Sequence, residues 1–297
     1  MKKIVVTGCT GIIGSAIIRE ALNNNYEIIC IVRKNSKRIG NIPKSKRLTI
    51  VECNIGDYAT LKIDTKCDSF IHLAWDETFG DQRDNVEIQE ANIQYTLNAV
   101  QLAKRCGCKV FIGAGSQAEY GVKKEPLTGD MSVNPQSGYG IAKYAAGKLS
   151  RMLCMQLGVR FNWIRIVSTY GINDAPFTLI SYVISELKAG KSPELTKCEQ
   201  IWDYTYCDDA ARAFLAVAEK GVDGKFYALG SGNARKLADY IRDIQLIINP
   251  DISIGYGKRD YYPHQPMFLA VDNSDLVNDT GWKPRIGFTD GIKGIIG

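Results

Sequence analysis

KIVVTGCTGIIG, residues 3–14, opens the chain with an apolar, β-branched run that passes directly into a glycine-rich turn. An amphipathic helical pattern follows over residues 12–23. Gly8 allows the tight turn, Gly11 lets the backbone approach a pyrophosphate, and Gly14 permits close contact between helix and strand. The N-terminus of that helix offers unpaired N–H groups and the positive end of its dipole. Because the glycines stand between a strand and a helix, the stretch predicts a dinucleotide-binding site.

The same alternation continues to about residue 166, with short β-branched runs separated by longer helical patterns. Parallel strands that are buried on both faces read as nearly continuous apolar runs, and these strands do. The order therefore predicts an α/β fold, a Rossmann-type, doubly wound parallel sheet with crossover helices. The expected strands span residues 2–8, 27–33, 48–53, 69–75, 109–115 and 160–166, and the expected helices span 12–23, about 85–106 and about 139–157.

After about residue 166 the strands become short and prolines enter the loops. We therefore predict a dinucleotide-binding domain over residues 1–168 and a smaller, mixed α/β substrate-binding domain over 169–297. The segment near 201–220 is expected to return to the first domain. The ligand crevice of an open α/β sheet lies at the carboxyl ends of its strands, which the second domain would cover. Later helices are expected at 178–188, 208–219 and 236–247.

Composition and charge narrow the class of protein. Hydrophobic residues make up 45% of the chain and charged residues 23%, as in ordinary globular enzymes. The net charge is only +5, and the basic cluster over residues 33–47 has no aromatic platform around it, so no nucleic-acid partner is expected. No apolar run is long enough to cross a bilayer, and the opening MKKIVVTG does not resemble a signal peptide. We expect a cytoplasmic protein without a membrane partner.

Cysteine and histidine usage argues against a metal site. The nine cysteines are odd in number and form no CxxC pair. Most lie in apolar surroundings, as Cys30 and Cys154 do, which indicates buried, reduced thiols. The two histidines, His72 and His264, are isolated and support neither a metal centre nor a hydrolase triad. No bound metal is expected.

The end of the second expected strand bears on the choice of cofactor. A site selective for NAD places an Asp or Glu there, about twenty residues beyond the glycines, to hold the ribose hydroxyls. Residues 32–38 read VRKNSKR and contain no acid. Arg33 could pair with the 2′-phosphate of NADP, helped by Asn35, Ser36 or Arg38, so NADP is favoured over NAD. The alternative interpretation is an exposed basic loop.

Three residues suggest acid–base chemistry at a reacting oxygen. Tyr139 and Lys143 begin an expected helix, and their spacing of four puts both on one face. A free phenol has a pKa near 10, and a neighbouring ammonium lowers the pKa, which makes the phenol a usable acid and base. Ser116 follows the fifth strand at the sheet edge where ligands bind. Each feature alone is common, but the combination of the three residues with TGxxGxxG supports a catalytic role for them.

With these motifs in place, the chain resembles the extended short-chain dehydrogenase/reductase family, also called the NAD-dependent epimerase/dehydratase family. The resemblance covers almost the whole chain. It rests on TGCTGIIG (7–14), HLAW (72–75), Asn92, GSQAEYG (115–121), YGIAK (139–143), IRIVSTYG (164–171), WDYTYCDDAARA (202–213) and GWKPRIGFTDGI (281–292).

The resemblance implies roles for the matching residues. Tyr139 would exchange a proton with a sugar hydroxyl or ketone, Lys143 would bind the nicotinamide ribose and tune Tyr139, and Ser116 would orient the substrate oxygen. Hydride would pass between the nicotinamide and the sugar carbon. It also implies a nucleotide-diphosphate sugar as substrate and a homodimer formed through the helices near 85–106 and 139–157.

The expected cofactor-binding residues are Thr7, Gly8, Thr10, Gly11, Ile12, Ile13, Gly14, Arg33, Asn35, Ser36, Arg38, Asn54, Ile55, Leu73, Ala74, Trp75, Asn92, Tyr139, Lys143 and Ile166. The expected substrate-binding residues are Trp75, Ser116, Gln117, Tyr139 and Trp202.

Departures from the family pattern narrow the chemistry. The 4,6-dehydratases carry Asp-Glu directly after the serine position, where this chain has Gln117 and Ala118, so dehydration is not expected. The 3,5-epimerase/reductases carry a cysteine at the position of Ala118. Many relatives have an arginine where this chain has Trp202, which could stack on a base or sugar face or simply pack in the core.

Redox at one carbon remains, which leaves two enzyme hypotheses and one of another class. Arg33 favours a reductase that consumes NADPH, and the GSQAEYG and WDY segments resemble reductases of nucleotide-linked 4-keto-6-deoxyhexoses. The alternative is a 4-epimerase with tightly bound NAD. A third hypothesis is a redox-sensing regulator that only binds NADP, but such proteins usually lose the tyrosine–lysine pair that this chain retains.

Overall fold

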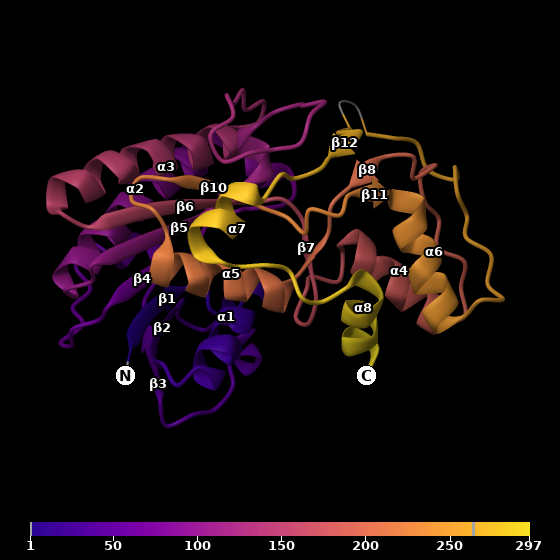
Figure 1. The fold of residues 1–297 in the computed structure, drawn as a ribbon. Coiled ribbons are helices and arrows are strands. Elements are labelled where there is room, and N and C mark those ends of the chain that lie inside the picture. The colour runs from indigo at the N-terminus through magenta and orange to yellow at the C-terminus, as the bar shows by residue number, and fades with distance from the viewer. Residues whose placement is uncertain (1, 263–264) are drawn as a thin grey trace.

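A seven-stranded, fully parallel sheet forms the centre of the computed structural model, which describes residues 2–262 and 265–297 (Figure 1). The predicted doubly wound sheet is confirmed, and its six predicted strands are joined by a seventh near residue 226. In spatial order the strands are β10 (Phe226–Leu229), β6 (Arg160–Ile166), β5 (Val110–Ser116), β4 (Ser69–His72), β1 (Lys3–Thr7), β2 (Glu27–Val32) and β3 (Leu48–Glu52).

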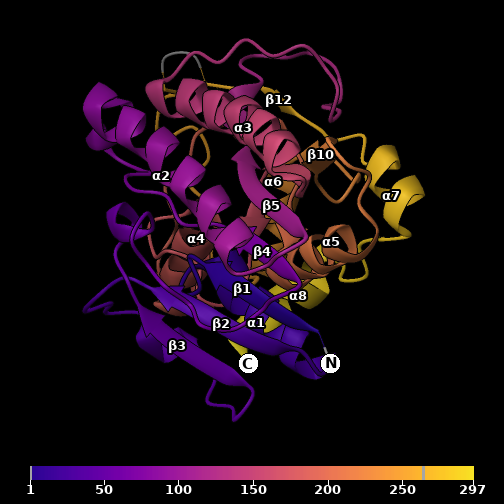
Figure 2. The same cartoon turned by 90° about the vertical axis from the view of Figure 1, so that its left-hand side faces the viewer.

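Alternate residues of the buried strands face two separate cores, because successive side chains of a strand point to opposite faces. Ile4 and Val6 of β1 belong to one core and Val5 to the other. The first core lies under α1 (Ile12–Asn23) and α5 (Cys207–Lys220), and the second under α2 (Val86–Arg105) and α3 (Gly138–Leu157). Figure 2 shows the two pairs of helices on opposite faces of the sheet.

The later part of the chain builds a smaller lobe at one end of the sheet (Figure 1). This lobe contains a three-stranded sheet in the order β11-β8-β12, and β7 and β9 form a separate two-stranded sheet. The remaining elements are β7 (Thr169–Tyr170), α4 (Leu179–Lys188), β8 (Ile201–Trp202), β9 (Thr205–Tyr206), β11 (Arg235–Lys236), α6 (Leu237–Ile248), β12 (Phe268–Leu269), α7 (Ser274–Thr280) and α8 (Phe288–Ile296).

The chain passes between the two parts more than once. After β8 and β9 it returns to the large sheet as α5 and β10, and α7 packs against α5. The domain division predicted at residue 168 stays a prediction. α5 and β10 follow residue 168 in the chain but pack with the large sheet. All nine cysteines are free and buried, as expected. Over residues 2–262 and 265–297, the helices are too short or too polar to cross a membrane.

Candidate active site

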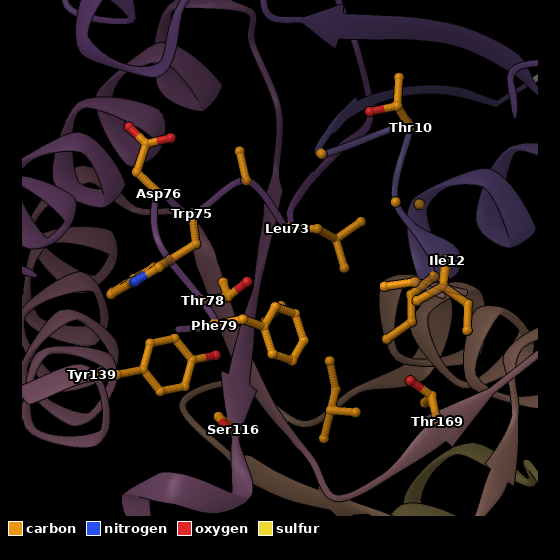
Figure 3. Close-up of a pocket in the computed structure, with 18 of the residues that line it drawn as sticks. Thr10, Ile12, Leu73, Trp75, Asp76, Thr78, Phe79, Ser116, Tyr139 and Thr169 are labelled. Carbon is orange, nitrogen blue, oxygen red and sulfur yellow. The ribbon is translucent and has the colours of Figure 1, made fainter. Parts of the chain in front are cut away.

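A cavity of about 1320 Å³ opens at the carboxyl ends of the parallel strands. Its walls come from the loops that follow β1 to β6 and from the segment after β7. In Figure 3, Thr10 and Ile12 of the glycine turn lie on one side and Tyr139 and Ser116 on the other, with Leu73 between them. The cavity thus brings the predicted cofactor turn and the predicted catalytic residues together.

The glycine turn has the shape that a pyrophosphate requires. Gly8 has φ of +70°, and a Cβ there would lie 2.9 Å from the backbone nitrogen of Ala74. A Cβ on Gly14 would lie 2.2 Å from the carbonyl oxygen of Gly8. Helix α1 begins after Gly11 without a side-chain cap, so its first N–H groups are available to an anion. These residues fit the diphosphate of a nicotinamide dinucleotide.

Two predicted cofactor residues position the loop after β4 and do not line the cavity. The buried hydroxyl of Thr7 accepts the N–H groups of Leu73 and Ala74 at 3.1 and 3.2 Å. The buried amide of Asn92 accepts the N–H of Asp76 and donates to its carbonyl oxygen, both at 2.9 Å. Both residues therefore act on the backbone that borders the cavity.

The basic turn after β2 contributes two of its predicted residues to the cavity. Arg33 and Arg38 line the cavity, whereas Asn35 and Ser36 do not. Asn35 has φ of 58° in an exposed turn, which directs the chain around the arginines. Burial raises the pKa of the Asp76 carboxyl, and the nearby positive charge of Arg33 opposes that rise.

Tyr139 and Lys143 occupy the first two turns of α3, which Ser137 caps by accepting the N–H of Gly140 at 3.1 Å. The ammonium of Lys143 is buried and donates to the carbonyl oxygen of Ala114 at 2.7 Å. It lies 3.8 Å from the centre of the Trp75 ring, which packs edge to face with the ring of Tyr139 at 6.0 Å. The indole of Trp75 thus contacts both Lys143 and Tyr139 at the edge of the cavity that all three residues line.

The acid–base properties differ from the sequence expectation. Burial raises the pKa of Tyr139 to about 12, opposed by a hydrogen bond with Ser116 and by the positive charge of Arg83. Burial lowers the pKa of Lys143 to about 7, while the negative charge of Glu119 raises it. The ammonium that was expected to act most strongly on the phenol is itself close to losing its proton. Arg83 supplies a positive charge that no sequence motif indicated.

His72 is structural. Its imidazole Nδ1 lies 2.9 Å from the hydroxyl oxygen of Thr7. Burial, followed by the charge of Lys143, lowers the pKa of His72 to about 3, so the ring is neutral at physiological pH. His264 lies outside the described residues. Within the described ranges no cluster of His, Cys, Asp and Glu is arranged to hold a metal ion.

The cavity includes most of the predicted residues and several that were missed. Trp202 does not line the cavity, and its indole N–H donates at 2.9 Å to the hydroxyl of Ser168, a residue that does. The predicted residues that line the cavity are Gly8, Thr10, Gly11, Ile12, Ile13, Gly14, Arg33, Arg38, Asn54, Ile55, Leu73, Ala74, Trp75, Ser116, Gln117, Tyr139, Lys143 and Ile166. Lining residues that sequence motifs did not indicate include Asp76, Thr78, Phe79, Arg83, Asp84, Asn173, Asp174, Tyr204 and Tyr262.

Several known proteins resemble the chain in sequence and in fold. The chain is 28% identical to a dTDP-glucose 4,6-dehydratase from Escherichia coli, over 98% of this chain and 91% of that protein. It is 24% identical to a CDP-abequose synthase from Salmonella typhimurium, over 99% and 97% of the two chains. A UDP-glucuronic acid 4-epimerase from Bacillus cereus, solved with UDP-glucuronic acid and NAD, has the same fold with a TM-score of 0.86. That structure is 23% identical and covers 98% of this chain and 97% of its own. The model of the NAD dependent epimerase/dehydratase family matches residues 4–230, and the chain belongs to that family.

Proposed function

We propose that the protein reduces the 4-keto group of a nucleotide-diphosphate-linked 4-keto-6-deoxy sugar and uses NADPH to do so. The observation that carries the proposal is the pair Arg33 and Arg38, which line the cavity beside the end of β2 where an NAD-selective site places an acid. Two guanidinium groups favour a 2′-phosphate over a bare ribose. The similarity to a CDP-abequose synthase supports a deoxysugar as the product.

The residues beside Ser116 support simple reduction over elimination of water. Gln117 lines the cavity, and Ala118 follows it with a methyl group. Elimination needs an additional acid and base next to the sugar, and neither an amide nor a methyl group supplies them. The overall similarity to a 4,6-dehydratase is therefore compatible with a different reaction, because residues 117 and 118 lack the acid and base that elimination needs.

The bound nicotinamide would supply the hydride. Tyr139 holds its phenolic proton at neutral pH, because its pKa is about 12, and donates that proton to the ketone oxygen as the oxygen gains negative charge. Ser116 donates a hydrogen bond to the same oxygen and orients it. The positive charges of Lys143 and Arg83 stabilise the phenolate that remains.

The test is a spectrophotometric assay of the purified protein. NADPH is mixed with 4-keto-6-deoxy sugars linked to dTDP, CDP, GDP or UDP, and oxidation of the cofactor is followed by its absorbance. We expect stoichiometric loss of NADPH with at least one nucleotide and formation of a deoxysugar. Absence of oxidation with all four would overturn the reductase proposal.

The alternative is a 4-epimerase, which the fold similarity to a 4-epimerase solved with NAD favours. It predicts NAD that co-purifies with the protein and sugars that interconvert without net change in cofactor. Protein that is isolated without cofactor and binds NADPH more tightly than NADH would count against it.

We also propose a homodimer formed through α2 and α3. Helix α3 exposes a row of large apolar side chains, Ile141, Met152 and Met155, at 54%, 56% and 76% of their surface. Burying such side chains against a second copy would remove apolar surface from water. Sedimentation equilibrium of the purified protein measures the mass directly, and a monomer at micromolar concentration would contradict the proposal.

A further inference from the structure

Glu119 is a fully buried carboxylate directly behind the candidate active site. It ends the short helix η4 (Gln117–Glu119) that follows β5. Its Oε1 accepts the backbone N–H of Ser116 and the indole N–H of Trp163, both at 2.9 Å. Its Oε2 accepts the Nε–H of Arg165 at 2.7 Å. Burying a carboxylate is costly unless donors surround it, and three donors do so here.

Arg165 is held as firmly as its partner. The guanidinium is only 3% exposed and donates through Nη1 to the carbonyl oxygen of Gly129 at 3.1 Å. The rings of Tyr120 and Phe226 each lie 4.9 Å from its central carbon. The ion pair therefore has hydrogen bonds and aromatic faces around it, and it cannot shift without repacking the core.

The strand that leads to Ser116 is shaped around this pair. A Cβ on Gly115 would lie 2.5 Å from Oε1 of Glu119 and 2.3 Å from the indole nitrogen of Trp163. Only glycine allows so close an approach. Ser116 is then fixed twice, because Glu119 accepts its N–H and its own hydroxyl oxygen accepts the N–H of Ala118 at 3.2 Å.

Glu119 and Lys143 approach the same indole, because Glu119 accepts the N–H of Trp163 at 2.9 Å and the ammonium nitrogen of Lys143 lies 6.0 Å from the centre of that ring. Burial lowers the pKa of Lys143, and the negative charge of Glu119 raises it. Burial raises the pKa of Tyr139, and the negative charge of Glu119 adds to that rise. The other titratable groups around Glu119 and Lys143 are neutral at physiological pH or paired. The imidazole of His72 on β4 has a pKa of about 3, Tyr139 on α3 has a pKa of about 12, burial raises the pKa of Tyr120 beyond Glu119, and Arg165 on β6 is paired with Glu119.

We propose that Glu119, held by Arg165, is a positioning residue that fixes Ser116 through its backbone N–H and places a negative charge beside the ammonium of Lys143. The inference rests on the catalytic roles proposed for Ser116, Tyr139 and Lys143. It assigns a function to an acid that does not line the cavity.

The test compares Glu119→Gln with Asp209→Asn. Asp209 in α5 is also fully buried, pairs with Arg212, and accepts the backbone N–H groups of Arg285 and Ile286 at 2.8 and 2.9 Å, but it does not line the cavity. It therefore controls for the loss of any buried, arginine-paired carboxylate. Folding is checked by circular dichroism and cofactor binding by fluorescence titration.

We expect Glu119→Gln to lower kcat by about 10- to 100-fold, with KM changed by less than about threefold. The amide has one acceptor oxygen for the three donors of Ser116, Trp163 and Arg165, so the loop that bears Ser116 shifts and orients the reacting oxygen poorly. Activity requires Lys143 as ammonium and is lost as pH rises through its pKa. Without the charge of Glu119 that pKa falls, so the alkaline limb of the kcat profile moves to lower pH by about one unit. Asp209→Asn should leave the position of that limb unchanged.

A readout without turnover separates this inference from the proposed function. The lysines are methylated reductively with ¹³C-formaldehyde, and the Lys143 signal, assigned by its loss in Lys143→Arg, is titrated by NMR. We expect a lower pKa in Glu119→Gln than in the wild type, even if no keto sugar is reduced. An unchanged titration together with an unchanged kcat profile overturns the inference. If Glu119→Gln does not fold, the double variant E119Q/R165Q, which leaves no unpaired buried charge, replaces it in the titration of Lys143, where the loss of the negative charge alone should lower the pKa in the same way.

Discussion

The guanidinium of Arg83 lies 4.8 Å from the centre of the Tyr139 ring. The segment that bears it, η3 (Asp81–Asp84), is tied to the start of α3 because Asp84 accepts the N–H of Gly138 at 2.6 Å. Arg83 lines the cavity, and its charge lowers the pKa of the phenol. The loop after β4 thus places a second cation at the candidate general acid.

Replacing Arg83 with glutamine should slow reduction about tenfold at neutral pH, because the phenolate left by proton transfer loses a stabilising charge. The pKa of Tyr139 should rise, and the limb of the pH–rate profile that reports the phenol should move to higher pH. Arg83→Lys keeps the charge and serves as the control. Equal losses in both variants would show that shape, not charge, matters at this position.

Tyr139→Phe should remove the proton donor and lower turnover by about 10²- to 10⁴-fold. The affinity for NADPH should remain within about twofold, since the phenol acts on the substrate oxygen. Rapid-mixing kinetics measure the chemical step, and fluorescence titration measures cofactor binding. A comparable loss of NADPH affinity would show that the phenol of Tyr139 contacts the cofactor and not the substrate oxygen.

Arg33→Ala should weaken NADPH binding about tenfold or more and leave NADH binding nearly unchanged, because the guanidinium pairs with the 2′-phosphate alone. The matched control is Lys37→Ala. Lys37 is an exposed cation of the same basic turn, but it does not line the cavity. Calorimetric titration with both cofactors decides the question. If Arg33→Ala weakens NADH as much as NADPH, the 2′-phosphate interpretation fails.

Gly14→Ala should destabilise the fold by about 1–3 kcal/mol and abolish cofactor binding, because the added methyl would lie 2.2 Å from the Gly8 carbonyl oxygen. Gly40→Ala is the control, since its Cβ would meet no atom within 4 Å. Thermal unfolding and cofactor titration are measured on both. Wild-type stability in Gly14→Ala would mean that the turn can relax away from the helix.

The sequence was sufficient for the fold because local features determine it. Strand, turn and helix at residues 3–23 follow from β-branching, three glycines and helical periodicity, and six of the seven strands of the sheet read as apolar runs. β10 was missed because it lies after residue 166, where the regular alternation of strands and helices ends. Its four apolar residues are too few to distinguish a strand from part of a helix.

The remainder of the site depends on contacts between distant residues. Thr7 and Asn92 stand in motifs that predict contact with the cofactor. Their side chains instead form hydrogen bonds with the backbone of the loop after β4. Trp202 follows a family motif, but Ser168 takes its indole N–H. Arg83 lies beside Tyr139, 56 positions away, and Glu119 is paired with Arg165, 46 positions away, separations at which no local pattern gives information.

The return of the chain to the large sheet has a consequence for biosynthesis. When residues 1–168 have been made, β6 is an open edge and the apolar face of α1 has no cover, because β10 and α5 do not yet exist. A fragment that ends at residue 168 should therefore expose unpaired backbone and aggregate. The test is to express fragments 1–168 and 1–230 and to compare their solubility. We expect only the fragment 1–230 to be soluble, because it includes α5 and β10.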